Sequence, residues 1–380
     1  MLLSAGLRVL TTGRFRRHLA PLSLPESFNN IVFKSITQNY LPKLLTQNHL
    51  PKSSTDKDFF MSAFDSQLSI CGEFRHPRQM LDNQTYDGHV SIHDDKMAAD
   101  LGFTGAPIEG PTHFSLFVPL LAEIFGQAWF ETGCISAHYQ TMVIEGEEVR
   151  AFAARPAAGE RITRIWAEKR DGTPVLTGTA SIGPDHPTSE LDTRRAKLRP
   201  SEQLVILCDL HVGQKGLAPE SAIMGFDESM GDLYPFSLNE KLERITELSP
   251  WYTAEAGDTS PWGRAIIPLE MLSVLTQYSS REAGYKMKGP AVGLFADQEI
   301  KLIKGPLFVN QAYRLEREIV CLSESRRVES NWIMTRVYDV DTNELLAECL
   351  LNSATLKDSY AKYAEEAAAL GKVIAGLDDR

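Results

Sequence analysis

The sequence contains no histidine after His211, no CxxC pair among its five cysteines, and no unbroken apolar run long enough to cross a bilayer. Widely spaced cysteines form neither a disulfide framework nor a zinc site, which favours a reducing compartment. The most apolar stretch, residues 114–130, contains Pro119 and Glu123 and is shorter than the roughly 20 residues that a membrane span needs. We therefore expect no membrane span and no metal site.

Several catalytic signatures are also missing. The sequence has no GxSxG nucleophile elbow, no P-loop and no GxGxxG dinucleotide turn. These absences disfavour a serine hydrolase, an NTPase and an NAD-dependent enzyme. The formal net charge of −11 disfavours a nucleic-acid-binding surface. We expect a small-molecule or protein partner, no nucleic acid and no cofactor.

The basic residues are concentrated at the N-terminus. Residues 1–52 hold seven Lys or Arg residues and one acidic residue, Glu26. An Arg-rich, acid-poor segment with Leu and Ser is typical of an organelle presequence, and a disordered extension is the alternative. We treat residues 1–60 as this extension. A presequence predicts a mitochondrial location, and its absence predicts a cytoplasmic one.

The rest of the chain has two blocks with the same layout. In the first, helical spacing of apolar residues over 110–127 precedes strand-like runs at 161–169 and 174–182, which an Asp171-Gly172 turn joins. In the second, helical spacing over 268–279 precedes strand-like runs at 293–303, 312–322, 330–340 and 345–356. Helices this apolar must be wrapped by a sheet on most sides. The pattern predicts an α+β fold in which a long central helix and an antiparallel sheet occur twice.

This layout divides the chain into five segments. The extension is followed by a first repeat at 61–190, a linker region at 191–250, a second repeat at 251–358 and a tail at 359–380. The linker follows a Gly- and Pro-rich cluster at 183–187 and is polar and irregular, apart from a candidate strand at 202–210. In the tail, residues 360–370 are expected to form a short surface helix.

Residues 92–110, IHDDKMAADLGFTGAPIEG, are the most informative segment. They resemble the run that leads into the buried central helix of the MaoC-like, (R)-specific enoyl-CoA hydratases. The resemblance extends over 86–183 and, more weakly, over 251–358. It implies a double hot-dog fold and a role in lipid metabolism, with acyl thioesters of CoA or acyl carrier protein as ligands. Two repeats in one chain mimic the usual hot-dog dimer, which leaves monomer and homodimer both open.

The resemblance also implies hydration or dehydration at C2–C3 of the acyl group. His93 matches the histidine that moves the proton, and the N–H of Gly110 matches the donor that polarises the thioester carbonyl at the helix start. The carboxylate that partners this histidine in the family corresponds to Gly88 here. Its candidate replacements are Asp87, which lies one residue away, Asp95, His89 and Glu109.

Glu109 stands where the family usually has a second histidine. Acidic residues in this region act in hot-dog thioesterases, so hydrolysis by Glu109 is the alternative enzymatic function, and a charge that complements the helix dipole is its structural alternative. Thr112 and His113 follow within one turn and point either at the ligand or into the sheet. A non-catalytic acyl-thioester-binding module is the hypothesis from a different class.

The second repeat departs further from the family pattern. Pro268 falls where the helix-start glycine is expected, and proline has no N–H to donate. Because no histidine follows His211, histidine-based acid–base chemistry must come from the first repeat. We expect His138 to be structural, and Arg264 to be a surface residue in preference to a ligand of a CoA phosphate.

Overall fold

A computed structural model of the chain describes residues 68–81, 84–86, 89–90, 92–93, 98–99, 104–199, 201 and 203–372. The expected extension over 1–60 lies outside these residues. The described residues all belong to one unit. Among them, no helix combines the length and the apolar character that crossing a membrane requires.

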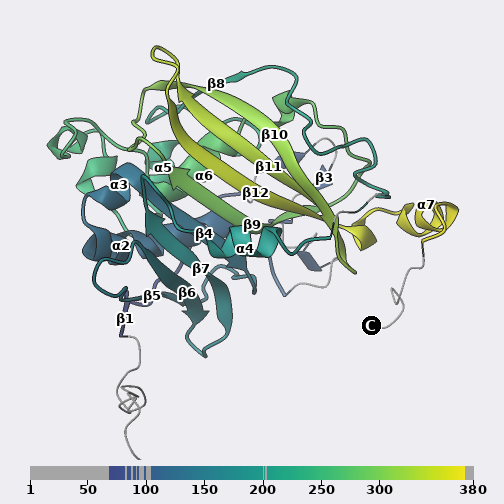
Figure 1. Cartoon of the computed structure of the whole chain (residues 1–380), viewed down its shortest axis with the longest axis horizontal. Helices are drawn as coiled ribbons and strands as arrows, with labels where there is room; N and C mark the ends of the chain where they lie inside the picture. The colour runs from purple at the N-terminus through teal and green to yellow at the C-terminus, as the bar shows by residue number, and fades with distance from the viewer. Residues whose placement is uncertain are drawn as a thin grey trace, which may run out of the picture. The chain divides into compact units, whose positions relative to one another are not determined.

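Ten antiparallel strands form a single sheet (Figure 1). They are β1 Ser69–Cys71, β4 Gly133–Tyr139, β5 Val149–Ala154, β6 Ile162–Lys169, β7 Pro174–Ile182, β8 Glu220–Ile223, β9 Gly293–Leu302, β10 Ala312–Glu324, β11 Val328–Asp339 and β12 Leu345–Leu356. A separate two-stranded sheet pairs β2 Thr85–Tyr86 with β3 His89–Val90 in antiparallel orientation. The order in the large sheet is β1-β5-β6-β7-β4-β9-β12-β11-β10-β8.

The strand order is symmetric about the β4–β9 pair. Moving outward, the first half runs β4-β7-β6-β5 and the second half runs β9-β12-β11-β10. β4 and β9 pair antiparallel, with Ile135 opposite Ile300 and His138 opposite Asp297. The sheets that follow the two predicted central helices are therefore joined edge to edge, which confirms the predicted α+β double hot-dog arrangement.

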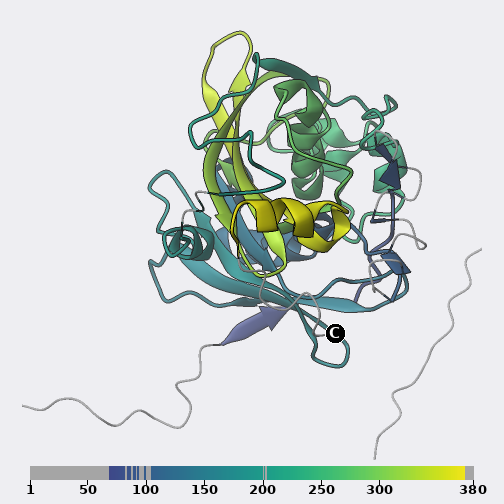
Figure 2. The same cartoon turned by 90° about the vertical axis from the view of Figure 1, so that its right-hand side faces the viewer.

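The concave face of the sheet encloses the central helices (Figure 2). In the first half these are the 3-10 helix η1 Gly110–Phe117 and α2 Val118–Phe125, followed by α3 Ala128–Thr132; in the second half the central helix is α6 Leu269–Gln277. All nine residues of α6 are buried. The remaining helices are α4 Glu190–Arg195, α5 Leu238–Leu242, α7 Tyr363–Ala369 and the short 3-10 helices η2 Pro250–Tyr252, η3 Gly257–Thr259, η4 Ser280–Ala283 and η5 Lys357–Ser359.

The first central helix is not the single α-helix that the spacing predicts over 110–127. Its first half is a 3-10 helix, and the change to α-helix occurs at Val118. Pro119 has no N–H to give to the carbonyl of Ser115, and the N–H of Val118 bonds that carbonyl at the tighter 3-10 spacing.

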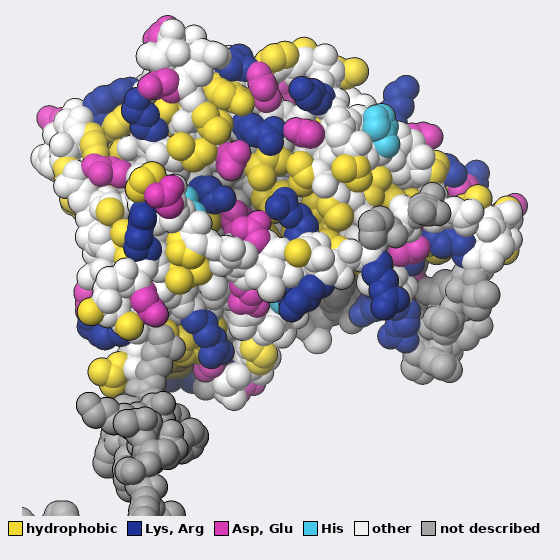
Figure 3. Space-filling model, viewed as in Figure 1, with side chains coloured by type: hydrophobic (Ala, Val, Ile, Leu, Met, Phe, Trp, Pro, Cys, Tyr) yellow, Lys and Arg dark blue, Asp and Glu magenta, His cyan; other side chains and the backbone are white. Residues whose placement is uncertain are grey.

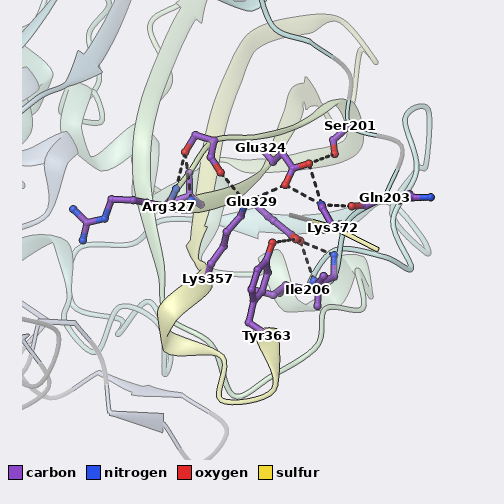
Figure 4. Close-up of polar contacts among 12 residues, drawn as sticks. Ser201, Gln203, Ile206, Glu324, Arg327, Glu329, Lys357, Tyr363 and Lys372 are labelled. Atoms are coloured by element: carbon purple, nitrogen blue, oxygen red, sulfur yellow. Dashed lines mark hydrogen bonds and ion pairs between the residues drawn. The ribbon is translucent and has the colours of Figure 1, made fainter. Parts of the chain in front are cut away.

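The predicted strand at 202–210 is wrong. Its apolar side chains are buried, but the N–H groups of Val205, Ile206 and Leu207 donate to the carboxylate of Glu329 at 2.9–3.1 Å, where a strand would bond a neighbouring strand (Figure 4). The hydroxyl of Tyr363 on α7 donates to the same carboxylate at 3.0 Å. One fully buried acidic side chain thus fixes both the linker and the C-terminal helix. The linker also contains α5, β8 and all of α4 except Glu190, and the sequence did not predict these elements.

Close approach of two strands requires glycine at position 178. Gly178 on β7 lies opposite Ala137 of β4, and a Cβ at this position would lie 1.8 Å from the carbonyl oxygen of Ser136. Because that oxygen belongs to the backbone, we expect Gly178→Ala to lower the free energy of unfolding by about 2–3 kcal/mol, measured by urea denaturation. Gly293→Ala is the control, since its Cβ would meet nothing closer than 3.8 Å. Equal losses of unfolding free energy in the two variants would contradict the requirement for glycine at position 178.

Candidate functional site

The residues just before η1 form the frame of the candidate site. The N–H of Ile108 donates to the carbonyl of Val143 at 2.9 Å, and Pro107 forms a β-bridge with Ile144. Glu109 then adopts an extended conformation and is the N-cap of η1. The predicted site residues His93, Glu109, Gly110 and Thr112 are all attached to this segment or contact it.

His93 is half-buried, and its Nδ1 lies 2.5 Å from the carbonyl oxygen of Pro107. A carbonyl oxygen can only accept, so Nδ1 carries a proton, and Nε2 is the ring nitrogen that can accept one. Gln79 Nε2 donates to the same carbonyl oxygen at 2.8 Å. The protein thus fixes the orientation and the tautomer of His93 against a residue two positions before Glu109.

Gly110 brings an aromatic ring against the start of the helix. A Cβ at this position would lie 2.7 Å from Cζ of Tyr139, so only glycine leaves room for the ring. The Tyr139 hydroxyl donates to Oε1 of Gln298 at 3.3 Å. Among the described residues, the N–H of Gly110 has no acceptor. Such an N–H can donate to a ligand carbonyl.

Glu109 is half-buried and belongs to a polar contact that the sequence reasoning missed. Its Oε2 accepts a hydrogen bond from the Thr112 hydroxyl at 3.3 Å, and Lys241 of α5 donates to that hydroxyl at 3.2 Å. Lys241 Nζ also lies 3.3 Å from Oε1 of Glu270 on α6. The Lys241 and Glu270 side chains are only 4% and 2% exposed. A lone acidic residue in the apolar run of α6 is the signal that could have found this pair.

The buried pair shifts the ionisation of both partners. Burial raises the pKa of Glu270, and the charge of Lys241 opposes that rise. Burial is also the largest effect on Lys241 and lowers its pKa, but the carboxylates of Glu270 and Glu109 outweigh it, so the net shift of the Lys241 pKa is upward. Lys241 is therefore a protonated ammonium group at neutral pH.

The remaining predicted site residues include His113, Asp87 and Asp95. His113 lies in the core at 3% exposure, and among the described residues its Nδ1 has no hydrogen-bond partner. Asp87 and Asp95 lie outside the described residues, and their roles stay predictions. Within the described part of the chain, no group of His, Cys, Asp and Glu side chains is placed to hold a metal ion.

The second repeat has the same backbone frame with different side chains. The N–H of Ile267 donates to the carbonyl of Leu307 at 2.9 Å, as Ile108 does in the first repeat. This match aligns Pro268 with Glu109 and Leu269 with Gly110, which corrects the sequence alignment of Pro268 with Gly110. The helix start here borders a narrow apolar pocket, whose lining includes Trp129, Phe130, Tyr252, Ile267, Leu269 and Leu302. Apolar side chains have thus replaced the acid and the glycine.

His138 lies on the convex face of the sheet. Its Nδ1 is 2.7 Å from Oδ1 of Asp297 across the β4–β9 seam, and Arg194 of α4 contacts both residues. Figure 3 shows this face, where side chains of both charges are mixed with apolar ones. These contacts hold α4 on the sheet, so they support a structural role for His138.

The guanidinium carbon of Arg264 lies 4.2 Å from the centre of the Phe308 ring, so the two side chains stack.

Burial, followed by the charges of Lys241 and Lys169, lowers the pKa of His113 from 6.5 to about 3. Between these values the unfolded chain binds one more proton here than the folded chain does. The free energy of unfolding should therefore fall by about 1.4 kcal/mol for each pH unit lost below 6.5, and His113→Leu should remove this dependence. Urea denaturation at pH 7, 6 and 5 measures it, and His76→Leu, at an exposed histidine, is the control. Parallel pH profiles for wild type and His113→Leu would refute the buried neutral imidazole.

No protein-family model and no curated protein matches the chain. Among solved structures, one similar chain is named as a MaoC domain protein dehydratase from Chloroflexus aurantiacus J-10-fl, at 12% identity and a TM-score of 0.50, with 80% of this chain and 99% of that chain covered. A conserved protein of Mycobacterium tuberculosis with a double hot-dog fold matches at 11% identity and a TM-score of 0.43, covering 69% and 86%. A chain named as an oleoyl thioesterase from Lactobacillus plantarum matches at 10% identity and a TM-score of 0.36, covering 76% and 96%. Together with the strand order, the first of these similarities shows that the chain has a double hot-dog fold.

Proposed function

We propose that the chain is a hydratase or dehydratase that acts at C2–C3 of an acyl thioester presented by CoA or a carrier protein. The observation that carries this proposal is the fixed tautomer of His93. Its Nδ1–H is bound to the carbonyl of Pro107, so Nε2 is the ring nitrogen that can act as the base. Pro107 lies three residues before Gly110, whose N–H has no acceptor among the described residues. A base and a carbonyl-polarising donor are the two groups that this reaction needs.

In the hydration direction, the N–H of Gly110 binds the thioester carbonyl oxygen. His93 Nε2 takes a proton from water while the water oxygen bonds to C3, and the electrons of the C2=C3 bond move towards the carbonyl. The resulting enolate oxygen is stabilised by the same N–H and by the positive end of the helix. A proton then adds to C2 and the carbonyl re-forms, so one water has been added. Glu109 or Asp87 orients the water and relays the proton.

Hydrolysis of the thioester is the second candidate function. The observation that favours it is the hydrogen bond that Glu109 accepts from Thr112. A carboxylate held as an acceptor beside the carbonyl-binding N–H can also take a proton from a water that attacks the thioester carbon. The two reactions release different products and can be separated directly.

The test uses purified protein and a series of 2-enoyl-CoA thioesters of increasing chain length. We expect the enoyl-thioester absorbance to fall without release of free CoA. His93→Ala should lower kcat by about 10²–10⁴ fold, because it removes the base. His76→Ala is the matched control, since His76 is an exposed histidine that contacts Gly146 and Glu148, outside the proposed site.

Two outcomes would replace the proposal. Release of free CoA that is lost in Glu109→Gln would establish the thioesterase. Binding of acyl-CoA without change in either signal would establish the binding module.

A further inference from the structure

The polar contact at the start of η1 connects three parts of the chain. Glu109 and Thr112 come from the first repeat, Lys241 from the linker helix α5, and Glu270 from α6 of the second repeat. The contacts run in sequence, from Glu109 to Thr112 at 3.3 Å, from Thr112 to Lys241 at 3.2 Å, and from Lys241 to Glu270 at 3.3 Å. Only Glu109 is more than slightly exposed.

The chemistry of these groups fixes the direction of the hydrogen bonds. An ammonium group only donates, so the Thr112 oxygen must accept from Lys241. The single hydroxyl proton of Thr112 is then left to point at Glu109. Without Lys241, that hydroxyl would have the usual alternative of bonding a backbone carbonyl in the preceding turn.

Lys241 contacts a second group besides its ion-pair partner. Glu270 contacts both Lys241 and Ser115, whereas Lys241 also donates a hydrogen bond to the Thr112 hydroxyl. Apolar residues often replace a buried ion pair at little cost, so pairing alone does not explain a lysine here. The ammonium group bridges Glu270 and Thr112, at 3.3 Å and 3.2 Å, and so couples the charge of Glu270 to the orientation of the Thr112 hydroxyl.

α5 is also fixed to the other half of the site. A capping box at Ser237 starts this helix, with Ser237 N–H to Glu240 Oε2 at 2.7 Å. Arg244, just after the helix, donates to the carbonyl of Gln79 at 2.8 Å, and Gln79 in turn donates to the carbonyl that holds His93. The linker therefore contacts the supports of both His93 and Glu109.

We propose that Lys241 is a positioning residue of the first-repeat site, which holds the Thr112 hydroxyl in the orientation that donates to Glu109 and so fixes this carboxylate beside Gly110. The kinetic consequence rests on the proposed function, but the hydrogen-bond coupling does not. The linker and the second repeat thus complete a site whose reacting groups lie in the first repeat.

The first test measures unfolding, so it does not depend on the protein having the proposed enzymatic activity. A double-mutant cycle of Thr112→Val and Glu109→Gln, measured by urea unfolding of the full chain, gives the coupling between these two residues. We expect a coupling of at least about twofold in the unfolding constant, and its loss in a Lys241→Met background. Because Lys241→Met leaves Glu270 unpaired, the cycle is repeated with Lys241→Met combined with Glu270→Gln. A coupling that persists without Lys241, or that is absent in the wild type, overturns the proposal.

The second test is kinetic and uses the enoyl-CoA assay. Lys241→Met and Thr112→Val should each lower kcat about tenfold with little change in KM, and the double variant should be no slower than either single variant. Thr112→Ser should restore most of the lost turnover. Lys357→Met is the matched control, because it removes another buried lysine, which pairs with Glu324.

Multiplying effects in the double variant would show independent, structural roles and overturn the proposal. If the wild type itself turns over no enoyl-CoA, the proposed hydratase function fails, and the unfolding cycle alone decides the role of Lys241.

Discussion

The antiparallel pairing of β4 with β9 is the constraint on which the rest of the structure depends. It joins two sheets into one and places Ile135 opposite Ile300 on the face that covers the helices. A single continuous sheet must then enclose both central helices, which brings Glu270 of α6 near Thr112 of η1 through their shared partner Lys241. Contacts between the repeats at the candidate site are therefore a consequence of the seam.

The central helices of the two repeats start with the same backbone hydrogen bond but have different side chains around that start. Ile108 and Ile267 make the same N–H to carbonyl bond before their helices, so the helix starts are equivalent. In the first repeat, the glycine N–H has no acceptor among the described residues and directly follows an acid. In the second, Leu269 occupies the equivalent position, and the neighbouring pocket is lined by apolar side chains. The fold provides two equivalent helix starts. The side chains at these starts differ, and the candidate polar site lies at the first one.

The sequence predicted those parts of the structure that depend on local patterns. The run at 161–169, which alternates, and the run at 174–182, which an Asp171-Gly172 turn joins to it, match β6 and β7. Residues 202–210 are as apolar as a strand, but the buried carboxylate of Glu329 takes their N–H groups, and no local pattern reveals a partner more than 120 residues away. The same reason hid Lys241, which lies 129 residues from Thr112. Of the site, the sequence indicated the helix start with His93, Glu109 and Gly110, while its supports came from tertiary contacts.

The central claim is that the N–H of Gly110 binds the thioester carbonyl beside His93. A crystal structure with a saturated acyl-CoA, which has no C2=C3 bond to hydrate, tests it most directly. The account predicts the carbonyl oxygen within hydrogen-bond distance of the Gly110 nitrogen, about 3 Å, with C3 of the acyl chain facing His93 Nε2. A carbonyl bound away from Gly110, for example at the helix start beside Leu269, would contradict it.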